Sequence, residues 1–293
     1  MAPDALVLQV LTGLSRAAVL FIVASGLSLV FGAMRIVNIA HGSLYMVGAF
    51  LAVTVAGWLG GTLGFVMALI LVPLLVAVLG GVMEVAVLRR LYGKEHLLQL
   101  LATFAILLII ADGVRFFYGE RPKSLRPPQF LQGAARFGDT FFPKYSLALM
   151  AAAVVIGVVL WLLMTRTGLG RDIRAAVSDP EMLGMVGVNV SRLFTILFAL
   201  GAGLAGIGGV LAGPQTTILL GMDINIIVES FAVVIIGGLG SLVGTAVGAV
   251  LVGVAFALGI TIVPSAALAI VFLVMVAVLV WRPYGLFGIP TEA

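Results

Sequence analysis

Long apolar stretches, each near the length that a bilayer-spanning helix needs, recur along the whole chain. A spanning helix takes about 20 mostly apolar residues. Only 10% of the residues are charged, whereas soluble domains carry roughly a quarter. We therefore predict an all-α polytopic membrane protein with about eight transmembrane helices, forming one membrane domain over residues 1–293. The predicted spans are residues 6–31, 40–58, 62–88, 97–118, 145–164, 193–213, 226–260 and 264–281.

The apolar stretch 226–260 is too long for one simple span. The sequence GGLGS at 237–241 interrupts it, so we predict two half-length helices that meet at a glycine break, as in discontinuous transporter helices. The first apolar segment lacks a basic leader, so we expect it to be retained as a span rather than cleaved.

Basic residues set the expected orientation. Nine of them fall in loops 32–41, 89–96 and 165–192 and the tail 282–293, against five in the loop 119–144. Since lysine and arginine mark cytoplasmic loops, we place the first group in the cytoplasm and the loop 119–144 and the N-terminus outside. The net charge of +4 then reflects membrane orientation, and we expect no nucleic-acid partner.

Asn38 and His41 lie between the first two predicted spans. Three residues apart, they share a face if the segment is helical, and polar groups at membrane depth pair or line a cavity. The alternative is an interfacial loop, with Arg35 as an anchor at the cytoplasmic end. One histidine without partners does not make a metal site, and the chain has no cysteine, so we expect no bound metal and no disulfide.

Glu229 precedes the glycine break at Gly237, Gly238, Gly240 and Ser241. Helix ends beside such a break offer free backbone groups to a substrate, which makes these residues candidates for a translocation pathway. Alternatively, the glycines only let two helices pack closely. A third acidic position, Glu84, is close to Arg89 and Arg90, and an interfacial ion pair is favoured there over a role in transport.

The polar segment 165–192 contains a helix start. Asp179 is a suitable N-cap, Pro180 suits the first helical position and Glu181 the first turn, and the helix should end near Gly187. A short capped helix of this kind suits docking to a partner, although an ordinary structured loop fits the same residues.

Enzyme signatures are absent from the sequence. There is no HExxH, no GxSxG with a nearby histidine and no GxxxxGK[ST] phosphate loop. The chain should therefore bind no nucleotide or other cofactor, and ATP would act through another polypeptide. A self-sufficient secondary transporter or channel with broken helices is the rival hypothesis, and a membrane enzyme is a third.

Four segments together resemble LivH-type permeases of branched-chain amino acid ABC transporters. They are GLSLVFGAMRIVNIAHGSLYMVGAF at 26–50, RAAVSDPEMLGMVGVNVSRLF at 174–194, FAVVIIGGLGSLVGTAVGAVLVG at 231–253 and the C-terminal WRPYGLFG. The resemblance implies a multi-pass permease in a bacterial cell membrane. It also implies a LivM-like second permease, two cytoplasmic ATP-binding subunits and an extracytoplasmic binding protein as partners, besides membrane lipid.

The resemblance places the ATPase-docking loop on Arg174, Asp179, Pro180, Glu181, Gly187 and Asn189. The family usually has two alanines where this chain has Leu183 and Gly184. It also implies that Asn38 and His41 brace a junction at the cytoplasmic gate. Substrates of such permeases include branched-chain or other hydrophobic amino acids, and relatives of the same pattern carry urea, short amides or aromatic acids.

Overall fold

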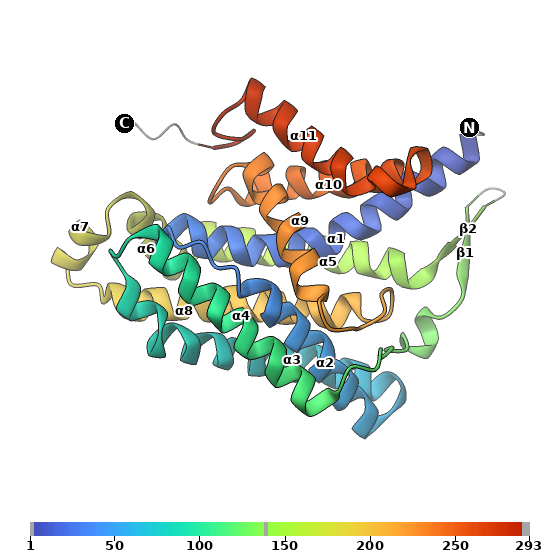
Figure 1. The fold of residues 1–293 in the computed structure, drawn as a ribbon, viewed down its shortest axis with the longest axis horizontal. Helices are drawn as coiled ribbons and strands as arrows, with labels where there is room; N and C mark the ends of the chain where they lie inside the picture. The colour runs from blue at the N-terminus through green and yellow to red at the C-terminus, as the bar shows by residue number, and fades with distance from the viewer. Residues whose placement is uncertain (1–2, 138–139, 289–293) are drawn as a thin grey trace.

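The computed structural model describes residues 3–137 and 140–288, and long helices dominate it (Figure 1). Within that part of the chain, eight helical stretches are long and apolar enough to cross a membrane, which confirms the predicted fold class. They are α1 (Pro3–Met34), α2 (His41–Leu59), α3 (Gly61–Ala86), α4 (His96–Tyr118), α5 (Lys144–Arg166), α8 (Val190–Ala212), α10 (Leu242–Ile262), and η3 (Pro264–Ala266) continued by α11 (Ala267–Trp281).

Shorter elements lie between the spans. They are η1 (Leu88–Leu91), η2 (Gln129–Leu131), α6 (Gly168–Ser178), α7 (Pro180–Met185) and α9 (Met222–Gly237). The loop 119–144 also forms a hairpin of β1 (Ala134–Phe137) and β2 (Thr140–Pro143), which pair antiparallel. The sequence analysis did not anticipate this hairpin or the 11-residue α6.

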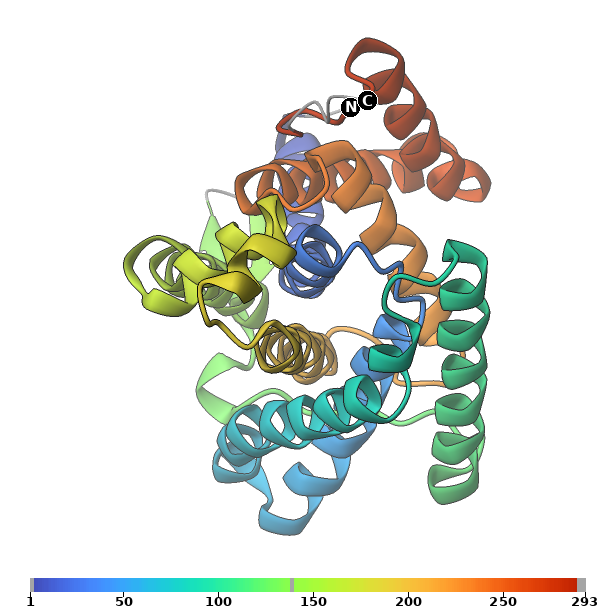
Figure 2. The same cartoon turned by 90° about the vertical axis from the view of Figure 1, so that its left-hand side faces the viewer.

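The helices are arranged around α1, which contacts α5, α8, α9 and α10 (Figure 2). In α1, 78% of the most apolar window is buried, against 11% in the last span. Glycines allow this close packing: a Cβ on Gly26 would lie 2.6 Å from the carbonyl oxygen of Gly201 in α8. Small residues at such contacts let helix backbones approach each other in membranes.

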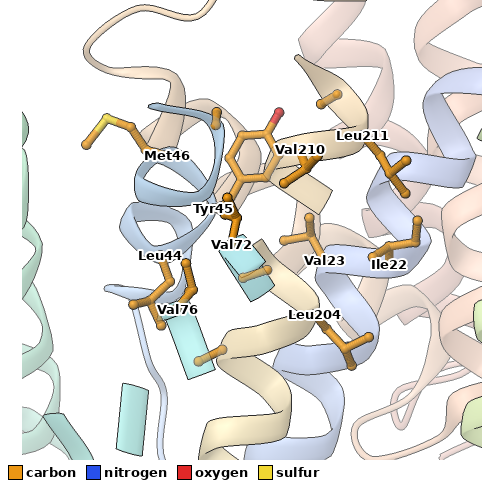
Figure 3. Packing of buried hydrophobic residues seen from close by; sticks show 14 of the residues in the cluster. Ile22, Val23, Leu44, Tyr45, Met46, Val72, Val76, Leu204, Val210 and Leu211 are labelled. Atoms are coloured by element: carbon orange, nitrogen blue, oxygen red, sulfur yellow. The ribbon is translucent and has the colours of Figure 1, made fainter. Parts of the chain in front are cut away.

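A continuous apolar core joins α1, α2, α3 and α8. Figure 3 shows Tyr45 of α2 between Val23 of α1 and Val210 of α8. Tyr45 is 4% exposed and Val23 and Val210 are fully enclosed. The core therefore fixes the start of α2 against the two central helices.

The long apolar stretch is broken at the predicted glycines, but not into two half-length helices. α9 has 16 residues, whereas α10 has 21 and is a candidate span on its own. The break lies beside the end of α1, because a Cβ on Gly240 would lie 3.1 Å from the Cα of Gly32. The predicted break is therefore present, whereas the expectation of two half-length helices is wrong.

Different elements lie at the two ends of the bundle (Figure 1). The start of α1 and the β1–β2 hairpin lie at one end, which we call the hairpin end. η1, α6, α7 and the tail 282–288 lie at the opposite end, called here the α7 end. This confirms the predicted grouping of 89–96, 165–192 and the tail on one side, for the part of the tail that the structure describes.

The segment 35–40 departs from that grouping. It leaves the end of α1 through Arg35, which has a positive φ of 53°, and re-enters the bundle. His41 at the start of α2 contacts Val23, which lies 11 residues, or about 16 Å of helix, before the end of α1. The expectation that 32–41 forms a loop on the cytoplasmic side is therefore wrong for its second half.

Candidate functional site

A cavity of about 1060 Å³ opens among the helices toward the hairpin end. Its walls come from α1, α5, α9 and α10, together with parts of the loop 127–143 and of the segment after α8. Most of the lining is apolar, including Leu20, Ile226 and Phe256. Cavities of this kind, with few convergent polar groups, are the usual location of small-molecule sites.

An ion pair between Arg16 of α1 and Glu229 of α9 projects into this cavity. Arg16 donates through Nε to Oε2 at 3.2 Å and through Nη2 to Oε1. The guanidinium carbon lies 3.7 Å from the centroid of the Phe256 ring, a cation–π contact from α10. The Glu229 side chain is 6% exposed and that of Arg16 is 36% exposed, so the cation faces the cavity.

A second polar cluster in the cavity lining is centred on Gln215. Its amide nitrogen lies 3.0 Å from Ser15 Oγ and 2.9 Å from Ser146 Oγ. Gln215 thereby links α1 and α5 to the segment that follows α8. These three side chains and the Arg16–Glu229 pair belong to the polar part of the lining, which also includes Gln9, Thr12, Gln132, Thr216, Thr217 and Asn225.

Val19, Leu20 and Tyr45 line the cavity, and each lies about one helical turn from Val23 or His41, which belong to a buried junction. His41, one helical turn from Tyr45, lies 3.0 Å through Nε2 from the carbonyl oxygen of Val23 and is 1% exposed. Asn38 is completely buried, and neither its amide oxygen nor its amide nitrogen has a hydrogen-bond partner in the described structure. The interpretation of these residues as a wet interfacial loop is wrong.

The junction also joins the starts of α2 and α9. Ser43 donates a hydrogen bond of 3.0 Å to Asp223 Oδ2, and Asp223 is 1% exposed. A Cβ on Gly42 would lie 2.3 Å from the Asp223 carbonyl oxygen, so the backbones touch. An acidic side chain at two helix N-termini is favoured by both helix dipoles.

The glycines of the break do not line the cavity. A Cβ on Gly237 would lie 2.3 Å from the Gly244 carbonyl, and one on Gly238 would lie 2.3 Å from the Gly288 amide nitrogen. Gly240 is exposed, and Ser241 caps α10 by accepting from the Gly244 amide at 3.0 Å. Gly237 and Gly238 thus pack against backbone, and a role of these four residues in the pathway stays a prediction.

The predicted docking residues lie together around α7 at the α7 end. Asp179 Oδ1 accepts from the amides of Glu181 and Met182 at 3.0 and 2.9 Å, and Pro180 begins the helix, as predicted. Gly187 has a φ of 91°. Asn189 caps α8, which the sequence analysis did not foresee, and Arg174 donates to the carbonyl oxygen of Met164.

Glu84 forms a closed network near the same end. Arg89 donates to both of its carboxylate oxygens at 3.2 Å, and Thr195 of α8 donates at 2.7 Å. Tyr92 donates to Oε1, and burial together with this carboxylate raises the pKa of the Tyr92 hydroxyl far above its usual range. The predicted ion pair with Arg89 is confirmed, while Arg90 is not part of it.

Comparisons with known proteins decide the family. The model of the branched-chain amino acid transport system / permease component family matches residues 9–279. The chain belongs to this family.

Within the residues that the structure describes, no group of three histidine, aspartate or glutamate side chains could hold a metal ion.

Several curated members of the family are similar over almost their whole length. The high-affinity branched-chain amino acid transport system permease protein BraD of Pseudomonas aeruginosa is 27% identical, over 96% of this chain and 95% of its own. LivH of Escherichia coli K12 is 25% identical over the same shares. A fructose import permease protein, FrcC of Rhizobium meliloti, is 35% identical over 45% of this chain and 37% of its own. No solved structure matches the chain.

The resemblance to LivH-type permeases is thereby confirmed, and the chain is a multi-pass membrane permease component. The sequence analysis missed three polar residues of the site and the junction.

Arg16, Gln215 and Asp223 were not among the residues that we selected from the sequence. Arg16 carried a signal nonetheless, because it is an arginine inside an apolar span, where charged residues mark functional positions.

Proposed function

We propose that this chain is a membrane-spanning permease subunit of an ATP-driven, binding-protein-dependent importer of branched-chain or other hydrophobic amino acids. The observation that carries the proposal is the similarity to BraD and LivH over 96% of the chain. The fructose permease covers less than half of it. The cavity supports the assignment, because its lining is mostly apolar and its polar groups include one ion pair without net charge.

In this proposal the subunit sits in the bacterial cell membrane with its hairpin end outside. A LivM-like permease completes the membrane part, two cytoplasmic ATP-binding subunits supply ATP hydrolysis, and an extracytoplasmic binding protein delivers the amino acid. The chain itself binds no cofactor. Residues 1–293 act as one permease domain.

We assign ATPase docking to the segment around α7. Its apolar side chains face outward: Met182 is 55% exposed, Met185 75% and Val186 72%. Asp179, Pro180, Glu181 and Asn189 define the helix ends that present them. Arg174 fixes α6 to the end of α5. Exposed methionines beyond the end of a spanning helix suit a protein partner, because they lie where lipid tails do not cover them.

The translocation route in this proposal follows the cavity to the junction at Asn38 and His41. Buried polar atoms without hydrogen-bond partners, as in Asn38, are rare in the core of a folded protein. They fit a junction that opens and exchanges partners during transport. Glu229 belongs to the same route at the cavity, and Gly237, Gly238, Gly240 and Ser241 belong to its α7 end.

The test is uptake of L-leucine, L-isoleucine and L-valine into proteoliposomes that contain the complete complex, its binding protein and ATP. We expect ATP-dependent uptake of these amino acids in preference to urea, an amide or fructose. The isolated chain should show no uptake under any ion gradient. Gradient-driven uptake by the isolated chain would establish the secondary-transporter alternative and overturn the proposal.

A further inference from the structure

The Arg16–Glu229 pair lies in a cavity far larger than the pair itself. We propose that this cavity is a low-affinity binding site for a free amino-acid zwitterion, with Arg16 binding its carboxylate and Glu229 binding its ammonium group. The inference rests on the proposed function, since it names how the permease holds the amino acid between the binding protein and the junction.

Arg16 has donors to spare for a ligand. Its Nε and Nη2 atoms contact Glu229, while Nη1 makes no hydrogen bond in the described part of the chain. The guanidinium has five N–H donors in a planar fork that fits a carboxylate. The Phe256 ring packs against one face of the Arg16 guanidinium, 3.7 Å from its central carbon. The guanidinium edge that carries Nη1 therefore has a fixed direction. An incoming carboxylate can bind there without displacing Glu229.

Glu229 has acceptors to spare in the same way. Each carboxylate oxygen accepts one hydrogen bond from Arg16, and a carboxylate offers about four acceptor positions. An ammonium group can therefore share Glu229 with Arg16. In an amino acid the two charged groups are neighbours, so its dipole can lie antiparallel to the dipole of the pair.

The absence of net charge suits a transported ligand. A lone buried arginine would bind any anion tightly, whereas Glu229 neutralises the charge of Arg16 and so lowers the affinity for the ligand. The walls add room for an aliphatic side chain, with Leu20, Ile226 and Ile260 among the lining residues. The cavity, at about 1060 Å³, matches the upper end of the roughly 300–1,000 Å³ of small-molecule pockets.

A purely structural ion pair would look different. In the Glu84 network the side chain of the acid is 0% exposed, and every donor around it comes from the protein. Arg89 is as exposed as Arg16, at 37% against 36%, and lines a smaller pocket of its own. The two pairs differ in the acid: Glu84 accepts four hydrogen bonds and does not line that pocket, whereas Glu229 accepts two, both from Arg16, and lines the cavity. The unused acceptor positions of Glu229 beside a cavity are the observation that points to a ligand.

Protection of an introduced cysteine gives a direct test, because the chain has no native cysteine. Thr12 lines the cavity one helical turn from Arg16, and Thr12→Cys is a small change that removes one methyl group. Ser124→Cys, exposed in the loop of the same end and outside the cavity lining, is the matched control. Both are measured in the assembled complex in nanodiscs, without binding protein or nucleotide, by the rate of labelling with a water-soluble thiol reagent.

Three ligands separate the two charges. L-leucine has both, leucinamide lacks the carboxylate, and 4-methylpentanoate lacks the ammonium group. We expect leucine to slow labelling of Thr12→Cys about tenfold at ten times its Kd, with little effect from either analogue and none at Ser124→Cys. Adding Glu229→Gln should abolish protection by leucine while the complex stays assembled.

Equal protection by all three ligands would overturn the inference, because the cavity would then bind any aliphatic molecule. Lack of protection by leucine would overturn it as well. ATP-driven leucine uptake, measured on the same preparation with binding protein added, keeps the two proposals apart. Protection decides the binding site and uptake decides the function, so either can fail while the other stands.

Discussion

Two buried glutamates lie near opposite ends of this bundle, and each is paired with an arginine. Glu84, toward the α7 end, is fully enclosed and accepts from Arg89, Tyr92 and Thr195. Glu229, toward the hairpin end, contacts only Arg16 among the described side chains and shares a cavity with it. The same two residue types thus form one saturated network and one unsaturated pair.

The difference between the two pairs separates a glutamate whose acceptor positions are all used within the protein from one that can still bind a ligand. Glu84 connects α3, η1 and α8, so its interactions already use the capacity of its carboxylate. Arg16 and Glu229 connect α1 to α9 but keep donors and acceptors free. An unsaturated pair in a water-accessible cavity can exchange partners, whereas a saturated one can only be broken.

The largest expected effect is on stability, from Glu84→Ala. It removes the carboxylate acceptor of Tyr92 and of Arg89, while Thr195 keeps its hydrogen bond to the Ser191 carbonyl oxygen, and breaking a buried pair costs about 3 kcal/mol. Glu229→Ala should cost about 1 kcal/mol or less, since Glu229 accepts only from Arg16 among the described residues and Arg16 keeps its contact with solvent. Thermal unfolding of the purified complex measures both. An equal loss in the two variants would end the distinction between them.

Arg16→Lys should have the next largest effect, and on transport. A lysine cannot bind Glu229 and a second carboxylate through one planar fork, so we expect leucine uptake to fall about tenfold, equivalent to 1.4 kcal/mol. Arg89→Lys is the matched control at the other glutamate and should leave uptake per assembled complex unchanged. Loss of uptake in the Arg89 variant alone would show that the Glu84 pair, and not the Glu229 pair, is needed for transport.

Gly187→Val tests whether the α7 end, which also contains the Glu84 network, contacts the ATPase. At a φ of 91°, a side chain adds about 1–2 kcal/mol of backbone strain, although no atom lies within 4 Å of the added Cβ. We expect more ATP hydrolysed per leucine transported, with normal insertion. Gly184→Ala, within α7, should behave as wild type. Normal coupling in Gly187→Val would remove the docking assignment.

Asn38→Ala should have the smallest effect on stability. Since neither polar atom of its amide has a partner, removal loses no hydrogen bond, and the change should stay below about 1 kcal/mol. Uptake should fall nonetheless if Asn38 acts in the junction. Unfolding temperature and uptake on one preparation decide this, and unchanged uptake would make Asn38 a passive core residue.

Most of the fold could be predicted from the sequence, because apolar length alone indicates a span. The predicted 145–164 corresponds to α5 at Lys144–Arg166, and 97–118 to α4 at His96–Tyr118. The re-entry of 35–40 could not be predicted. Its polar residues fit an interfacial loop equally well, and only the contact of the next residue, His41, with Val23 shows that the chain turns back into the bundle.

The candidate site was predicted in part. Glu229 was selected for its position before the glycines, but its partner Arg16 is 213 residues away, and no local pattern joins the two. Local capping at Asp179 was correct because a cap is formed by neighbouring residues. Gly238 shows the limit: its contact with Gly288 depends on how the tail folds back, which spacing cannot indicate.

The most direct test of the distinction between the two glutamates is the initial rate of ATP-driven L-leucine uptake in Glu84→Gln and Glu229→Gln complexes. Rates are divided by the amount of assembled complex in the same vesicles, so that a loss of folded protein does not count as a loss of transport. We expect the normalised rate to fall about tenfold in Glu229→Gln and to equal wild type in Glu84→Gln. A normal rate in Glu229→Gln, or an equal fall in both, would contradict the account.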